Sequence, residues 1–168
     1  MSLYIIPECY ANKGVGELVK ESIGNEFKGK VHVIHKKWFG RDRVLKEILK
    51  LIKTLKSDYV IAIIDYEEGL YRRYIDVIRS GKLKDLSCTE EGNIDSTLII
   101  RCGSRLKLII FDSNIEHVLL RYDKELESNP MKYKGEKAER EIIKLYEKNT
   151  KFKEYLCSLV NIVTRNLT

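Results

Sequence analysis

One unbroken apolar run constrains the fold of this chain more than any other feature. The run covers residues 59–64, Asp65 follows it directly, and Glu67 comes two residues later. A polar-free run of this length is typical of a strand buried on both faces, as in a parallel sheet with helices on each side. The acids then lie at the carboxyl edge of the strand, where open α/β sheets usually bind their ligands. The sequence therefore predicts an α/β fold with a site at this edge.

The spacing of Asp65 and Glu67 suggests what that site would bind. Residues two apart in extended chain point to the same side. Two acids that face one point repel each other unless a cation or a proton lies between them. A hard divalent ion with oxygen ligands, Mg²⁺ or Mn²⁺, is the natural occupant. The alternative is that both acids cap the next helix and face water.

The overall composition permits several partners and demands none. The chain has 168 residues and a net charge of +6, which allows a polyanionic partner. It contains no glutamine and is rich in Ile, Lys and Glu, which favours a thermophilic source, although AT-rich codon usage also favours Ile and Lys. Because no apolar run approaches 18 residues and no signal peptide is evident, we expect a cytoplasmic protein with no membrane partner.

The four cysteines show no metal-binding pattern. Cys9, Cys88, Cys102 and Cys157 form no Cys-x-x-Cys pair, and no histidine lies at zinc-ligand spacing from any of them. We expect mostly buried thiols in an intracellular protein, with a disulfide possible if the source is a hyperthermophile.

The hydrophobic periodicity predicts a mostly parallel sheet of four to five strands sandwiched by helices, in a Toprim- or Rossmann-like arrangement with C-terminal helices. Expected strands are 3–6, 31–35, 59–64, 97–102 and 107–111, and expected helices are 15–23, 41–56, 70–80, 115–122, 136–147 and 151–163. A glycine-containing turn precedes the first helix, and residues 81–96 are expected to form a polar connector. The expected organisation is an α/β domain over 1–123 and a helical extension over 124–168 packed on it.

A basic segment follows the second expected strand. Lys36, Lys37, Trp38 and Arg41 lie within it, and Phe39 is next to Trp38. Cations beside stacking faces are typical of proteins that bind single-stranded or looped nucleic acid. The alternative is that the aromatic rings enter the core while the cations remain in water.

Five further residues are candidates for the same site. Lys13 lies in the glycine-containing turn, and Arg72 and Arg73 begin the helix after the central strand, where they could hold a phosphate or pair with nearby acids. His35 ends its strand at the same edge of the sheet as the acids, or simply fills a strand position. Glu116 lies in the first turn of a helix, where an acid also stabilises the helix dipole.

The order of these elements resembles the Toprim domain. A first strand ends in Glu8, helix, strand and helix follow, and a third strand ends in Asp65-Tyr66-Glu67. Toprim domains occur in bacterial-type primases, topoisomerases, recombination-repair proteins, small RNA-maturing nucleases and nucleases of the overcoming-lysogenization-defect type. The segment 113–123 is similar to the serine, acid and leucine pattern of stand-alone Toprim-like proteins. The resemblance covers roughly residues 3 to 123.

The resemblance implies a metal-dependent reaction on nucleic acid. Glu8 would be the general acid/base or a metal ligand, and Asp65 and Glu67 would hold Mg²⁺. Two positions depart from the family pattern, because Cys9 replaces the usual glycine and Glu67 replaces an aspartate. The implied reaction is phosphodiester hydrolysis or phosphoryl transfer, or the chain is a degenerate member without activity.

Three other interpretations remain open at this stage. The first is a non-catalytic module of the same fold that binds nucleic acid or protein. The second is a phosphoacceptor domain of receiver type with Asp65 at a strand end, which lacks an acidic pair after the first strand. The third is a structural partner subunit, whose C-terminal helices could form a homodimer surface.

Overall fold

A computed structural model describes residues 1–23, 27, 29–37, 39–55, 57–66 and 86–167, with only the backbone of residues 41 and 42. Its elements, in chain order, are β1 (Ser2–Pro7), α1 (Tyr10–Ile23), β2 (Lys30–Val33), α2 (Arg41–Thr54), β3 (Tyr59–Tyr66), β4 (Cys88–Ile94), β5 (Thr97–Cys102), β6 (Leu106–Asp112), α4 (Ile115–Leu119), α5 (Glu125–Ser128), α6 (Ala138–Lys148) and α7 (Thr150–Thr164).

The described strands form one mixed sheet in the order β2-β1-β3-β6-β5-β4. The pairs β2–β1, β1–β3 and β3–β6 are parallel, whereas β6–β5 and β5–β4 are antiparallel. The predicted α/β class with a mostly parallel sheet is therefore confirmed. The sheet has six strands in the described part of the chain, which is more than the four to five predicted.

The strand missing from the prediction is β4. It occupies part of the segment 81–96 that the sequence predicted as a connector, and it carries polar residues at most positions. It lies at the edge of the sheet, and none of its positions is fully buried, so it needs few apolar residues. The turn to β5 is at Asp95 and Ser96, which have φ of 45° and 63°, and not at the glycine and asparagine of β4.

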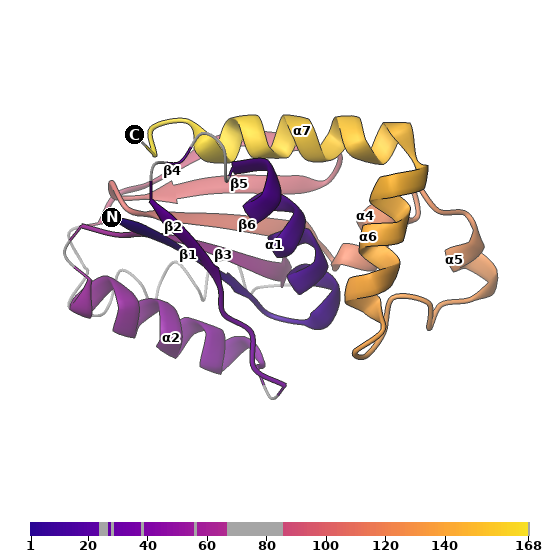
Figure 1. The fold of residues 1–168 in the computed structure, drawn as a ribbon, viewed down its shortest axis with the longest axis horizontal. Helices are drawn as coiled ribbons and strands as arrows, with labels where there is room; N and C mark the ends of the chain where they lie inside the picture. Colours follow the sequence, from indigo (N-terminus) through magenta and orange to yellow (C-terminus); the bar gives the residue numbers. More distant parts are fainter. Residues whose placement is uncertain (24–26, 28, 38, 56, 67–85, 168) are drawn as a thin grey trace.

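Helices cover both faces of the sheet. Alternate residues of β3 enter two separate apolar clusters: Ile61 and Ile63 pack with α1 and α7, while Ala62 and Ile64 pack with α2. Figure 1 shows α2 below the sheet, α7 along its top and α1 in front of the strands, with α4 and α6 beyond one end of the strands. The continuous apolar run of the sequence is thus the central strand of a three-layer arrangement.

The first helix begins earlier than predicted. It starts at Tyr10, so the predicted glycine-containing turn lies inside the helix. Gly14 is required there by close packing, since a Cβ at this position would lie 2.8 Å from the Cβ of Ile142 in α6. Gly16 similarly faces Ile5 of β1. These glycines therefore serve packing between elements and do not form a turn.

Several predicted boundaries also change. The second strand ends at Val33 and not at His35, and the helix predicted over 115–122 is shorter, since α4 ends at Leu119. The short helix α5 forms where no helix was predicted. The helix predicted over 70–80 lies outside the described residues. Both C-terminal helices form as predicted and share the apolar cluster of α1 and β1. The division of the chain at residue 123 stays a prediction.

The cysteines differ from expectation. Cys88 and Cys102 form a disulfide between β4 and β5, so these two are not thiols. Cys9 is a partly buried free thiol, and Cys157 is an exposed one. In the described part of the chain, no helix has the length and apolar character needed to cross a membrane.

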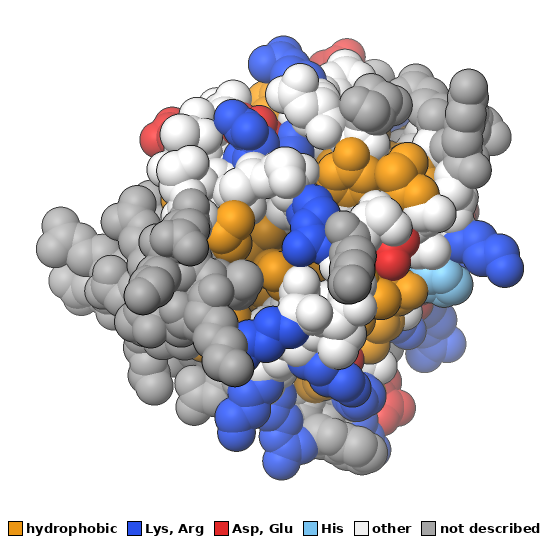
Figure 2. All heavy atoms as spheres, turned by 90° about the vertical axis from the view of Figure 1, so that its left-hand side faces the viewer, with side chains coloured by type: hydrophobic (Ala, Val, Ile, Leu, Met, Phe, Trp, Pro, Cys, Tyr) orange, Lys and Arg blue, Asp and Glu red, His pale blue; other side chains and the backbone are white. Residues whose placement is uncertain are grey.

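The outer side of α2 is basic. Arg43, Lys46, Lys50 and Lys53 are all exposed on this helix. Figure 2 shows Lys and Arg side chains gathered on the lower part of one face of the molecule, at the height where α2 lies in Figure 1. The basic side of this amphipathic helix therefore faces water.

Candidate functional site

Five of the predicted site residues line a pocket of about 210 Å³ at the carboxyl ends of β1 and β3, namely Glu8, His35, Lys37, Asp65 and Glu116. We call it the acid pocket. Its lining comes from Glu8, Cys9, Tyr10, Ala11, His35, Lys37, Phe39, Asp65, Glu116, Tyr133, Lys134 and Gly135. These residues are widely separated along the chain, so the pocket is a product of the fold as a whole.

Glu8 and Asp65 are held next to each other by the parallel pairing of β1 and β3. The backbone N–H of Glu8 donates to the carbonyl of Ile63 at 2.9 Å, which extends the strand pairing by one residue. The backbone N–H of Asp65 donates to Oε2 of Glu8 at 3.0 Å. The fold therefore brings Glu8 and Asp65, each at the end of its strand, into direct contact.

The carboxylate of Asp65 is poorly solvated and lies among other acids. Its Oδ1 accepts from the backbone N–H of Ile115 at 3.1 Å and from Nδ2 of Asn12 at 3.4 Å. Burial, followed by the charges of Glu8 and Glu116, raises the pKa of Asp65 to about 7. Negative charge is therefore costly at this point, and a bound cation would relieve it.

Glu116 is the third acid of the pocket. It lies in the first turn of α4, where it also favours the helix dipole. Lys134 donates to its Oε1, and this hydrogen bond is the largest cause of a raised pKa of Lys134. The lysine side chain thus brings a positive charge to the edge of the acid pocket.

The thiol of Cys9 is not prepared for nucleophilic chemistry. Burial, and then the charge of Asp65, raises the pKa of Cys9 to about 12. Its Sγ accepts from the backbone N–H of Asn12 at 3.4 Å. A thiol with this pKa stays protonated near neutral pH, so it is a poor nucleophile.

His35 presents an unprotonated nitrogen. Its Nδ1 lies 3.2 Å from the carbonyl of Pro7, which can only accept, so Nδ1 carries the proton. Its Nε2 is buried and has no hydrogen-bond partner among the described residues. Burial lowers the pKa of His35 and keeps the ring neutral. Tyr10 and Phe39 pack edge-on against this ring.

The basic candidates near the pocket are paired within the chain. Nζ of Lys13 lies 2.6 Å from Oε2 of Glu139, and Nζ of Lys37 lies 3.2 Å from Oε1 of Glu136. The ammonium of Lys36 lies 5.8 Å from the centre of the Phe39 ring. Of these three lysines, only Lys37 lines the acid pocket.

Five of the predicted site residues have side chains outside the described part of the structure. These residues are Trp38, Arg41, Glu67, Arg72 and Arg73. The proposed Asp65 and Glu67 metal pair and the proposed arginine contacts therefore stay predictions.

Sequence reasoning missed Asn12 and the segment that carries Lys134. Asn12 is fully buried, and its Oδ1 has no hydrogen-bond partner among the described residues. It precedes Gly16, Val19 and Ile23 at helical spacing, which could have placed it on the buried side of α1. Lys134 has no comparable signal, because its contact with Glu116 depends on tertiary packing.

The described residues provide oxygen ligands but no complete metal site. Among them, no group of three or more His, Cys, Asp or Glu side chains is arranged to hold a metal ion. Mg²⁺ requires less than this, since it is often bound by one or two carboxylates and several waters. Glu8 and Asp65, with Glu116 nearby, therefore fit the chemistry of a Mg²⁺ or Mn²⁺ site.

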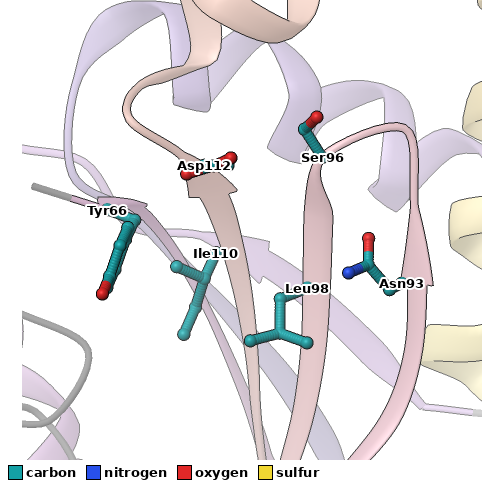
Figure 3. Close-up of a pocket in the computed structure, with 6 residues that line it drawn as sticks. All are labelled: Tyr66, Asn93, Ser96, Leu98, Ile110 and Asp112. Atoms are coloured by element: carbon teal, nitrogen blue, oxygen red, sulfur yellow. The ribbon is translucent and has the colours of Figure 1, made fainter.

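A second, larger cavity of about 330 Å³ lies beside the ends of β3 and β6. It is lined by Tyr66, Asn93, Ser96, Leu98, Ile110 and Asp112. Figure 3 shows that these residues come from four neighbouring strands and from the turn between β4 and β5. Asp112 is the one carboxylate among these described lining residues, whereas three carboxylates are among those of the acid pocket.

Comparisons of this chain with protein-family models, curated proteins and solved structures found no match. The functional assignment therefore depends on the acid pocket and on the sequence pattern around it.

Proposed function

We propose that this chain carries out metal-assisted phosphodiester hydrolysis or phosphoryl transfer on nucleic acid at the acid pocket. The observation that supports this proposal is the state of Asp65. Its carboxyl is buried beside two other acids, and its pKa is raised to about 7. An environment that opposes negative charge so strongly is more common at functional sites than in ordinary surface pairs.

In this proposal, Glu8 and Asp65 hold Mg²⁺ or Mn²⁺ with Glu116 nearby. The bound ion would neutralise charge on the phosphate and lower the pKa of a water molecule. Glu8 would move the proton. The unprotonated Nε2 of His35 is buried and could accept a hydrogen bond from a water molecule enclosed beside it. Lys37, on the pocket wall, would hold a neighbouring phosphate.

A non-catalytic binding module is the second candidate function. It is favoured by the hydrogen bonds of Asp65, which join the end of β3 to Ile115 at the start of α4 and to Asn12 in α1. A carboxyl with these contacts can have a purely structural role. This candidate predicts salt-sensitive binding of nucleic acid that ignores Mg²⁺ and survives loss of the Asp65 charge.

Calorimetric titration with Mn²⁺ separates the two functions. We would compare the parent, Asp65→Asn and the control Asp112→Asn, which removes an exposed acid at the end of β6. Binding in the parent and the control, together with loss of binding in Asp65→Asn, supports the metal site. Equal binding by all three proteins, or no binding by any, contradicts it.

Cleavage assays then test the reaction itself. Labelled single-stranded DNA and RNA would be incubated with the parent and with Glu8→Gln in Mg²⁺ or Mn²⁺. We expect cleavage or transfer by the parent and a loss of about 100-fold or more in the variant, which is typical when a general acid/base is removed. Binding without any reaction in either metal would favour the non-catalytic module.

A further inference from the structure

Three residues of the segment 134–139 pair with the candidate site, and each charge is opposite to the one it meets. Lys134 contacts the pocket acid Glu116. Glu136 and Glu139 contact Lys37 and Lys13, the lysines predicted to hold phosphates. The three residues that pair with the site are therefore one cation and two anions, while Lys137 of the same segment does not line the acid pocket.

A metal ion and two phosphates would present the same set of charges to the site. We infer that segment 134–139 is an internal occupant of the candidate site, with Lys134 in the place of the metal ion and Glu136 and Glu139 in the place of substrate phosphates. This inference rests on the proposed function and adds a regulatory element to it. Metal and polyanion must displace the segment's side chains before they bind.

The exposure of each pair indicates which contacts matter most. The side chains of Lys37 and Glu136 are 73% and 66% exposed, so water and salt screen this pair. Those of Lys13 and Glu139 are 26% and 25% exposed, and Lys134, itself 51% exposed, meets a Glu116 that is only 15% exposed. The pairs of Lys134 and Glu139 are therefore the effective part of the internal occupant.

The backbone of this segment is held at both ends, so displacement involves side chains only. Tyr133 is buried, and its hydroxyl donates to Oδ2 of Asp123 at 2.6 Å. Ala138 and Ile142 of α6 are fully buried, and Ile142 packs against Gly14 of α1. The side chain of Lys134, by contrast, is 51% exposed and can turn into solvent without moving the helix.

The metal half of the inference is tested with Mn²⁺. Lys134→Met keeps a long side chain and removes its charge, and Lys137→Met removes a charge from the same segment at a residue that does not line the acid pocket. We expect Lys134→Met to bind Mn²⁺ about fivefold or more tightly than Lys137→Met, since the competing cation has gone. Equal affinities in the two variants overturn the inference.

The polyanion half is tested with a short fluorescein-labelled oligothymidylate by fluorescence anisotropy. Glu139→Gln frees Lys13, and Glu147→Gln removes an exposed acid from the same helix as a control. We expect Glu139→Gln to bind about threefold or more tightly than the control, with a steeper dependence on salt. Equal binding by the two variants overturns the inference.

The two proposals fail in different ways. If the parent binds Mn²⁺, Asp65→Asn does not, and Lys134→Met matches its control, the inference fails and the proposed function stands. If no variant binds Mn²⁺, Lys134→Met included, the proposed function fails and the inference fails with it. Circular dichroism of each variant shows that an altered affinity does not come from unfolding.

Discussion

The burial of Asp65 predicts a specific dependence of stability on pH. The pKa of this carboxyl is about 7 in the folded protein, against an ordinary value of 3.8. Between these values the folded chain keeps a proton that the unfolded chain has lost, so the free energy of unfolding falls as pH rises. The contribution of this protonated carboxyl to the free energy of unfolding is fully present below about pH 4 and is lost by about pH 8.

The size of this effect follows from the same numbers. A pKa that moves from 3.8 to about 7 corresponds to about 4 kcal/mol. Water that reaches the pocket reduces the effect, and we expect a loss of about 2 to 4 kcal/mol between pH 4 and pH 8. Asp65→Asn resembles the protonated acid and cannot ionise, so this loss should be absent from the variant.

Urea unfolding of the parent and of Asp65→Asn, followed by circular dichroism from pH 4 to pH 8, measures the effect. The difference between the two proteins cancels the titration of groups that do not interact with Asp65. We expect the free energy of unfolding of Asp65→Asn to increase relative to that of the parent as pH rises. Saturating Mn²⁺ at pH 8 should stabilise the parent and not Asp65→Asn, because the ion binds only a folded protein that has the Asp65 carboxylate. A difference that stays constant across the pH range would refute the reasoning.

Three further predictions concern the fold. Gly14→Ala should destabilise the chain by about 1 to 3 kcal/mol in urea unfolding, because its Cβ would overlap α6; an unchanged midpoint would contradict this packing. Reduction of the Cys88–Cys102 disulfide, which spans 14 residues, should cost about 3 kcal/mol, seen as a lower Tm in dithiothreitol, whereas an equal Tm would count against the disulfide. Tyr155→Phe removes a buried hydroxyl bonded to Thr97 at 2.7 Å and should cost about 1 to 2 kcal/mol; a neutral result would show that Thr97 finds another partner.

The sequence was sufficient to predict the part of the fold that local pattern controls. The apolar run before Asp65 identified the central strand, because a strand buried on both faces needs apolar residues at every position. It also placed Asp65 at the same sheet edge as Glu8. Strand β4 escaped prediction because an edge strand can be polar, and the turn at Asp95 and Ser96 contains no glycine.

The parts that could not be predicted depend on contacts between distant segments. Gly14 looks like a turn residue in the sequence, and only the approach of α6 explains its place within a helix. Lys134 meets Glu116 because α6 packs on α1, which no local spacing encodes. The disulfide has the same character, since the pairing of Cys88 with Cys102 requires the unpredicted strand β4.

The distribution of the acid pocket along the chain has a consequence during synthesis. The strands that carry Glu8 and Asp65 leave the ribosome early, whereas Lys134 and the helix that carries Glu139 emerge much later. Until then a nascent chain presents its acids without their internal cation, and Lys13 and Lys37 without their internal anions. The same late segments also complete the apolar cluster around α1 and supply part of the pocket wall, so the acid pocket and its internal counter-charges are completed together.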